Sequence, residues 1–244
     1  MTYCLAINVN KGLVFASDSR TNAGVDYVTA YSKMHTFVWP EDRICVLLTS
    51  GNLATSQAVI NTIRNDVELN TQKVNLRTSR NLNEVARYIG ELSQNEQLRY
   101  ANAMQKTNIS AGASFIFGGQ IAGQRPEIFL IYPEGNYISA SPETPYLQIG
   151  ENKYGKPILD RIITPTVSLE DAARCALVSL DSTMRSNLSV GPPLELAIHT
   201  LDVIQAPYYI KLTLESPMYR SLQTSWSAGL HQAFTGLPRF DWEK

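Results

Sequence analysis

The chain has 244 residues, of which 44% are hydrophobic and 18% are charged, and its formal net charge is −1. This length and composition are typical of a globular protein with a sizeable core, and the near-neutral charge gives no electrostatic case for binding nucleic acid or an anionic membrane. No apolar run approaches the length of a membrane span, and the N-terminus lacks the basic segment and apolar block of a signal peptide.

The cysteines and histidines indicate no special chemistry. Cys4, Cys45 and Cys175 are widely spaced, and each stands among apolar residues. Isolated cysteines in an odd number are typical of reduced, buried thiols, so we expect a cytoplasmic protein. The histidines are scattered, no Cys-x-x-Cys motif occurs and no P-loop is present. These patterns predict no metal site and no cofactor.

The first half of the chain predicts strands followed by two helices. Leu5, Ile7 and Val9 alternate with other residues, which favours a strand over 3–9 with one buried side. A turn joins this strand to the apolar run 13–16, so the two form a hairpin. The polar stretch 21–32 predicts an exposed loop. The remaining expected elements are strands at 33–38 and 44–49, a helix after Ser50-Gly51-Asn52, and a second helix behind the capping pattern Asn81-x-x-Glu84.

The second half predicts the same order again. A helix is expected from Gly150 to about Ile162, and the next helix starts at the capping pattern Ser168-x-x-Asp171. The final thirty residues have weak periodicity and several aromatic side chains. They indicate a short helix and a tail that packs on a neighbouring subunit or covers its own core. The strands expected in this half are at 114–119, 127–132, 136–140, 146–150, 194–198 and 210–214.

The N-terminus carries a candidate nucleophile. Methionine before a small residue such as threonine is normally removed during synthesis, which would leave Thr2 as the first residue. A terminal threonine has a hydroxyl nucleophile and an α-amine with a pKa of about 8, which can act as the general base for that hydroxyl. Lys33 can tune the amine, and Asp18 can hold the lysine. If Met1 were retained, Thr2 would have no free amine and this mechanism could not run.

Simpler interpretations of the same residues stay open at this point. Most threonines that follow an initiator methionine have no function, and single Asp and Lys residues are usually surface charges. The Gly51 N–H is a candidate oxyanion donor because Gly51 stands between a buried strand and a helix start. An ordinary strand-to-helix turn, however, has the same pattern.

The segments GLVFASDSRTNAG and LLTSGNLA, with Lys33 between them, resemble the β-subunits of proteasomes, which are N-terminal nucleophile hydrolases. In that family a terminal threonine is followed at matching intervals by an Asp-x-Arg motif, a lysine and a Ser-Gly turn. The opening MTYCLAI has its threonine directly after Met1 and is most similar to the bacterial ancestral β-subunit (Anbu) branch. The resemblance extends from Thr2 to about Leu214.

The resemblance implies roles for the residues that match. Thr2 is then the nucleophile, Lys33 lowers the pKa values of its hydroxyl and amine, and Asp18 holds Lys33. Gly51 supplies the oxyanion donor, and Ser189 assists the catalytic residues. The carried-over substrate-binding positions are Asn22 and Thr49, while Arg20 orients a loop.

The chain also departs from the family pattern. Gly150-Glu151-Asn152-Lys153 stands where family members often have Gly-Ser-Gly-Ser. Ser186-x-x-Ser189-Val-Gly191 stands in place of an Asp-x-x-Ser-Gly element, so Ser189 keeps its position while Ser186 replaces an acid. These losses are consistent with narrow substrate demands or with weak activity.

Runs of strands and runs of helices predict an α+β fold built in layers. Two antiparallel sheets between two helix pairs would bury all the apolar faces, and this four-layer αββα sandwich is also what the resemblance implies. No repeat or linker occurs, so we expect one domain over residues 1–244, with 215–244 as a C-terminal tail.

Three functions remain open from the sequence. The first is a threonine peptidase that assembles into a homo-oligomeric ring or ring-like stack and cuts peptide substrates, with or without an ATPase partner. The second is a catalytically weak or inactive assembly subunit of the same kind. The third is a hydrolase of the same class that acts on a small amide.

Overall fold

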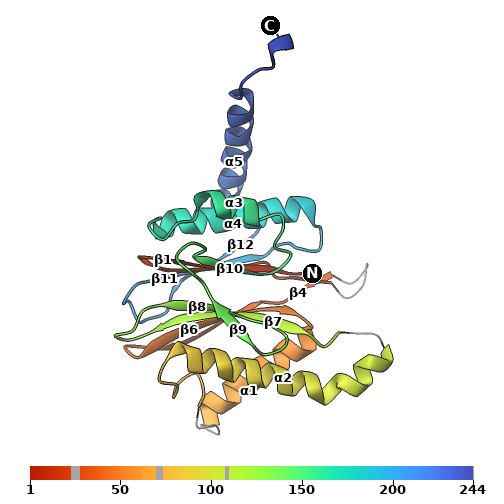
Figure 1. Ribbon diagram of the computed structural model, residues 1–244, viewed down its shortest axis with the longest axis vertical. Helices are drawn as coiled ribbons and strands as arrows, with labels where there is room; N and C mark the ends of the chain where they lie inside the picture. Colours follow the sequence, from red (N-terminus) through yellow and green to blue (C-terminus); the bar gives the residue numbers. More distant parts are fainter. Residues whose placement is uncertain (23–27, 70–73, 108–109, 244) are drawn as a thin grey trace.

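The computed structural model describes residues 1–22, 28–69, 74–107 and 110–243, and they form four layers (Figure 1). Two antiparallel sheets of five strands each lie face to face in the middle of the molecule, and helices cover the outer face of each sheet. The αββα sandwich predicted from the element order is therefore confirmed.

The first sheet contains the N-terminal hairpin and has the order β10-β1-β2-β11-β12. Helices α3 (Lys156–Ile162) and α4 (Leu169–Ser186) cover it. The Asp171 N–H donates to Ser168 Oγ at 3.0 Å, so the predicted cap of α4 is present. The strands are β1 (Tyr3–Val9), β2 (Gly12–Ser17), β10 (Tyr146–Gly150), β11 (Leu194–Thr200) and β12 (Tyr208–Leu212).

The second sheet has the order β5-β6-β7-β8-β9 and is covered by α1 (Leu53–Leu69) and α2 (Leu82–Thr107). The Glu84 N–H donates to Asn81 Oδ1 at 2.9 Å, as the capping pattern at the start of α2 predicts. The strands are β5 (Met34–Trp39), β6 (Arg43–Gly51), β7 (Ala113–Ile121), β8 (Glu127–Ile131) and β9 (Tyr137–Ser139).

The apolar core has three layers, one in each gap of the sandwich. The prediction that strand 3–9 has one buried side is wrong, because β1 is buried on both faces. Leu5 and Ile7 pack with α4, whereas Cys4 and Ala6 pack between the two sheets. These second-face residues are small and give a weak apolar signal. All three cysteines are buried and unpaired, as predicted.

The polar stretch 21–32 contains more structure than the predicted loop. β3 (Arg20–Asn22) pairs with β4 (Val28–Ala30) as a short antiparallel ribbon, and residues 23–27 between them lie outside the described residues. The described side chains of this ribbon, such as Thr21 and Thr29, are half-buried rather than core residues. Because these side chains are not in the core, the sequence of the ribbon shows no apolar alternation.

The helix predicted from Gly150 starts six residues later, at Lys156. Gly150 has a φ of 82°, which lies in the left-handed region, and the Glu151 N–H donates to the carbonyl of Thr2 at 2.7 Å. The segment between β10 and α3 is therefore used to hold the N-terminus of the chain.

The C-terminal region is a long helix, α5 (Pro217–Thr235), followed by a 3₁₀ turn at Asp241–Glu243. In Figure 1, α5 extends away from the α3 and α4 layer, and the C-terminus lies at the far end of the molecule. Tyr219 is the only buried residue of α5, and Phe234 and Trp242 are 72% and 78% exposed. Tyr219 belongs to the core and Leu222 packs against it, but the rest of the tail does not cover the core of its own chain. No described helix is both long and apolar enough to cross a membrane.

Candidate active site

Thr2 is held at the start of β1 by the last residue of β10, Gly150, and by Glu151 after it. It is only 9% exposed, and β1 begins directly after it. Its carbonyl accepts from the Glu151 N–H at 2.7 Å, and a Cβ at Gly150 would lie 1.9 Å from the same oxygen. This close approach requires glycine at position 150, so the position of Thr2 is fixed by a backbone contact.

Asp18 directly follows β2 and contacts the backbone next to Thr2. Its Oδ1 accepts from the Tyr3 N–H at 3.0 Å and from Lys33 Nζ at 2.6 Å, while its Oδ2 accepts from the Gly191 N–H at 3.2 Å. The side chain has no solvent exposure. Burial raises the pKa of this carboxyl group, and the neighbouring Lys33 opposes the shift. The three donors compensate for the loss of water.

Lys33 stands just before β5 and is 5% exposed. Besides Asp18, its Nζ donates to the carbonyl of Arg20 at 2.7 Å. The Arg20 guanidinium in turn donates to the carbonyl of Leu188 at 2.5 Å, so the Asp-x-Arg motif ties this region to the loop before β11. An ion pair held this firmly out of water keeps a positive charge at one fixed place.

Thr2 and Lys33 line one small cavity, which we call the N-terminal cavity, with a volume of about 240 Å³. Gly51 lines it as well, with a φ of 97° and with Gly112 O 2.4 Å from where a Cβ would stand. Sequence reasoning therefore identified residues that the fold brings together from three distant segments. The full lining is Met1, Thr2, Thr21, Lys33, Thr49, Ser50, Gly51, Leu53 and Ser56.

The charge distribution around this cavity acts on the N-terminal amine. Burial and the charge of Lys33 lower the pKa of the Met1 amine, and Asp18 opposes them. A lowered pKa increases the fraction of neutral amine near pH 7, and only the neutral amine can accept a proton.

Of the other predicted positions, Thr49 lies in the cavity wall, and its N–H donates to the carbonyl of Lys33 at 3.0 Å. Asn22 ends β3, and its side chain lies outside the described part of the structure. Ser189 does not line the cavity. Its Oγ donates to Asn187 Oδ1 at 2.5 Å, and Asn187 Nδ2 donates to Glu151 Oε2 at 3.1 Å.

Sequence reasoning missed that Glu151 and Asn187 are part of the site. Glu151 is 8% exposed, and Asn187 Nδ2 lies 3.9 Å from the sulfur of Met1. The signal was present in the departure from the Gly-Ser-Gly-Ser pattern at Glu151, but nothing in the sequence shows which residue faces it. Among the described residues, no group of three His, Cys, Asp or Glu side chains could hold a metal ion.

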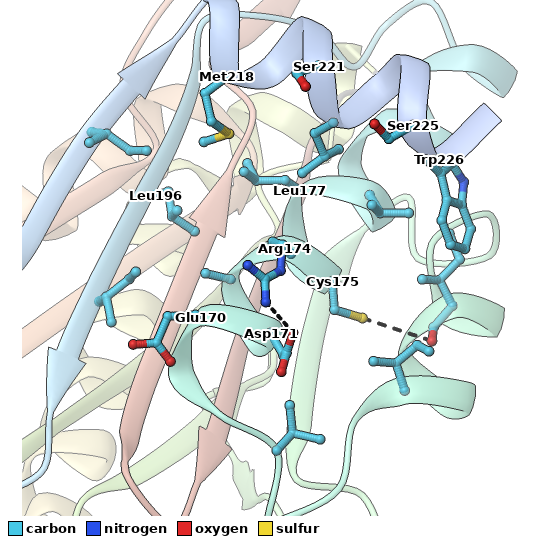
Figure 2. A pocket seen from close by; sticks show the side chains of 18 of the residues that line it. Glu170, Asp171, Arg174, Cys175, Leu177, Leu196, Met218, Ser221, Ser225 and Trp226 are labelled. Carbon is cyan, nitrogen blue, oxygen red and sulfur yellow. Dashed lines mark hydrogen bonds and ion pairs between the residues drawn. The ribbon is translucent and has the colours of Figure 1, made fainter. Parts of the chain in front are cut away.

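A larger cavity of about 890 Å³ lies between α4, β11, β12 and α5 and shares no lining residue with the N-terminal cavity. Figure 2 shows that apolar side chains such as Leu177, Leu196 and Met218 project into it, with Trp226 of α5 at its rim. Glu170 and the paired Asp171 and Arg174 also line it. The described lining of this α4–α5 cavity contains no threonine and no lysine, unlike that of the N-terminal cavity.

Comparison with known proteins agrees with this geometry. The profile of the proteasome subunit family matches residues 2–198. No match is found among curated protein sequences. Anbu from Pseudomonas aeruginosa, described as a helical assembly, is 44% identical with a TM-score of 0.91, and the alignment covers 98% of both chains.

Two further Anbu structures are similar over the whole fold. A Gly-1 mutant of Anbu from Hyphomicrobium sp. strain MC1 is 42% identical, with a TM-score of 0.90 and coverage of 99% of this chain and 100% of that one. Anbu, the ancestral β-subunit, from Yersinia bercovieri is 39% identical, with a TM-score of 0.91 and 98% coverage of both chains. The chain therefore belongs to the proteasome subunit family and is most like its Anbu branch.

Proposed function

We propose that this protein is an N-terminal threonine hydrolase that cleaves peptide amides, with Thr2 as the nucleophile after removal of Met1. The observation that carries the proposal is the convergence of Thr2 and Lys33 on one cavity, with Lys33 Nζ bound 2.6 Å from the buried carboxylate of Asp18. A scaffold has no need to bury an ion pair against its own N-terminus, because a buried pair costs desolvation energy.

The chemistry needs no residue beyond this cluster and a water molecule. The α-amine of Thr2 takes the hydroxyl proton while Oγ attacks the amide carbonyl carbon. The C–N bond then breaks, and the amine passes its proton to the leaving nitrogen, which leaves an acyl ester on Oγ. In the second half, water attacks the ester, the amine accepts the proton of that water, and Oγ regains a proton as the acid leaves.

The surrounding residues have supporting roles in this proposal. The N–H of Gly51 stabilises the oxyanion, since Gly51 lines the same cavity as Thr2. Burial and Lys33, which lower the pKa of the Met1 amine, act in the same direction on the amine of Thr2. Thr49 lines the substrate path, and Asn22 is a second substrate-binding residue. Ser189 orients Asn187 and, through it, Glu151.

We also infer that the protein forms a homo-oligomer, a ring or a ring-like stack. Support comes from α5, whose described residues beyond Tyr219 bury no side chain. Leu230 and Phe234 on α5 are 51% and 72% exposed, and Trp242 after it is 78% exposed. Repeated head-to-tail contacts of one surface close into a ring or continue as a helix, depending on the rotation between subunits. The P. aeruginosa Anbu complex is described as a helical assembly.

Light scattering after size-exclusion chromatography tests the assembly. We expect a mass of several subunits for the full chain and a smaller mass for the variant Phe234→Ser/Trp242→Ser, with an unchanged far-UV circular dichroism spectrum as evidence that the subunit stays folded. A monomeric wild-type protein would exclude the oligomer and favour the hydrolase of small amides.

Intact-protein mass spectrometry after treatment with a peptide epoxyketone tests the nucleophile. The untreated mass shows whether Met1 has been removed. We expect a single adduct on the wild-type chain and on Thr2→Ser, which keeps the hydroxyl and the small second residue, and no adduct on Thr2→Ala. A processed wild-type chain without an adduct, or a chain that retains Met1, refutes the proposal and favours the non-catalytic assembly subunit.

A further inference from the structure

Glu195 is a buried carboxylate that the proposed mechanism does not use. It lies on β11 and is 2% exposed, and because side chains alternate along a strand, it faces the gap between the two sheets as Ala197 does. Lys211 stands opposite it on β12, yet among the described residues no ion pair includes Glu195. A buried charge without a counter-charge costs free energy, so the groups that hold this carboxylate require an explanation.

Three hydroxyl groups bind the Glu195 carboxylate. The Tyr209 hydroxyl donates to Oε1 at 2.5 Å, and the Ser17 hydroxyl donates to Oε2 at 3.4 Å. The Ser32 hydroxyl lies 2.9 Å from both oxygens. Burial and the hydrogen bond to Glu195 raise the pKa of Tyr209, so this side chain remains a protonated donor. The carboxylate is therefore held by neutral donors from three different segments of the chain.

Ser17 connects Glu195 to Asp18, which is the next residue in the chain. Ser17 lies on β2 directly opposite Glu195, and Cys4 lies opposite Ser17 on β1. Burial raises the pKa of the Cys4 thiol, Lys33 lowers it, and the charges of Asp18 and Glu195 raise it further. One thiol thus lies in the field of all three charges, so Glu195 is a close neighbour of the ion pair.

Ser32 connects Glu195 to Lys33 in the same way. The Ser32 Oγ accepts from the Met34 N–H at 3.3 Å and lies 2.9 Å from the Met34 carbonyl oxygen, so this side chain spans the backbone of Lys33. The carbonyl of Lys33 accepts from the Thr49 N–H at 3.0 Å. The backbone that carries the lysine is therefore held by β6 in the second sheet and, through Ser32, by β11 in the first. Because the ammonium group stands on a flexible stem, its place depends on this backbone.

We propose that Glu195 is a positioning residue of the hydrolase: its carboxylate holds the residues directly before Asp18 and Lys33 and thereby fixes the place of the ion pair relative to Thr2. Glu195 is not among the described residues that line the N-terminal cavity, so it acts through the pair and not on the substrate. This inference rests on the proposed function, because it adds a residue to the machinery of the same nucleophile.

This role affects how the reaction depends on pH. Burial and Lys33 lower the pKa of the N-terminal amine and Asp18 opposes them, so these groups set that pKa. Two further charges in the neighbouring segment, Glu151 and Lys153, pair with each other at 3.6 Å. Without Glu195 the lysine is held less firmly near the amine, so the amine keeps its proton to higher pH. The increase of the reaction rate with pH should then occur at higher pH, because only the neutral amine accepts a proton.

The test follows formation of the peptide epoxyketone adduct by intact mass, over a range of probe concentrations and pH values. Glu195→Gln keeps the shape of the side chain and removes its charge. We expect the maximal rate constant (kinact) to fall about tenfold, the probe concentration for half-maximal rate (KI) to change by less than about twofold, and the pH curve of kinact to shift to higher pH. Tyr209→Phe is the second variant, in case Glu195→Gln does not fold. It removes one donor at the exposed end of the network and should lower kinact by about threefold.

Asp66→Asn is the matched control. Asp66 is a carboxylate of 6% exposure that accepts from the Tyr88 hydroxyl, as Glu195 accepts from that of Tyr209, but it lies near the end of α1. This variant should leave kinact, KI and the pH curve unchanged. An equal loss in both variants overturns the role of Glu195, because the effect would then be common to buried carboxylates.

The remaining outcomes separate this role from the proposed function. An unchanged kinact, a change in KI alone, or a slower reaction with an unshifted pH curve in folded Glu195→Gln overturns the positioning role while Thr2 remains the nucleophile. If Glu195→Gln does not fold, an unchanged kinact in Tyr209→Phe overturns the role in the same way. No adduct on a wild-type chain that begins at Thr2 overturns the hydrolase function and the positioning role together.

Discussion

Replacing Lys33 by methionine should destabilise the fold, because it leaves the Asp18 carboxylate buried without its counter-charge. Removing one member of a buried pair costs about 3–5 kcal/mol. Asp18 keeps the N–H groups of Tyr3 and Gly191, at 3.0 and 3.2 Å, so we expect the lower end, about 3 kcal/mol. For a chain of this size, that loss lowers Tm by about 6–12 °C.

The predicted loss of stability in Lys33→Met depends on pH. Burial raises the pKa of Asp18 and Lys33 opposes it, so loss of Lys33 raises that pKa further. A carboxyl group whose pKa is higher in the folded state binds more protons there, and stability increases as the pH falls through that value. The stability deficit of Lys33→Met should therefore shrink as the pH falls through the raised pKa of Asp18 towards the usual range of an aspartate carboxyl group.

Urea unfolding of the wild type, Lys33→Met and the double variant Asp18→Asn/Lys33→Met provides the measurement. The double variant should recover part of the loss, since the buried charge is gone. A Lys33→Met protein within about 1 kcal/mol of the wild type, or a double variant no more stable than the single one, would contradict the coupling described for this pair.

Three further substitutions test how the fold supports the site. Gly150→Ala places a Cβ 1.9 Å from the Thr2 carbonyl, so the epoxyketone adduct should form at least about tenfold more slowly, and an unchanged rate would show that Thr2 does not depend on this contact. Phe15→Ala removes a side chain with no exposure between the two sheets and should cost about 3–5 kcal/mol in urea unfolding; a loss below about 1 kcal/mol would mean that the gap collapses freely. Ser168→Ala removes the acceptor of the Asp171 N–H and should cost about 1 kcal/mol in thermal unfolding, whereas no loss would indicate that water replaces the cap.

The layers could be predicted from the sequence because their signals are local. The alternation in β1, the capping patterns of α2 and α4, and the apolar run of β2 each report packing within a few residues. The prediction of one buried face for β1 was wrong, since Cys4 and Ala6 face a second core layer that small residues can fill. Periodicity detects large side chains and overlooks small ones.

The sequence of helix α5 does not show where the helix packs. An apolar stripe usually marks the face of a helix that packs on the core. In α5 the apolar residues recur at four-residue intervals, yet only Tyr219 is buried, so the pattern does not show what the helix packs against. The stripe consists of Met218, Leu222, Trp226, Leu230 and Phe234. Its exposed aromatic residues are visible in the sequence, and they indicate a contact without showing where it lies.

The candidate site was predictable where a family motif fixes the spacing, as at Asp18 and Lys33. It was not predictable where contacts are set by the backbone of a distant segment. The buried position of Glu151 depends on the turn after β10, and its partner Asn187 lies in the loop that follows α4. Neither the residue types nor their spacing encode this pairing.

The way the N-terminus is anchored also sets an order of events during synthesis. Thr2 is among the first residues made, yet the groups that position it, at residues 150 and 151, are made much later. Asp18 waits longer still for its Gly191 donor, 173 residues further along the chain. A nascent chain therefore has no assembled N-terminal cavity until β10 and the loop before β11 have left the ribosome. The connectivity of the first sheet thus delays the positioning of Thr2 until most of the chain has been made.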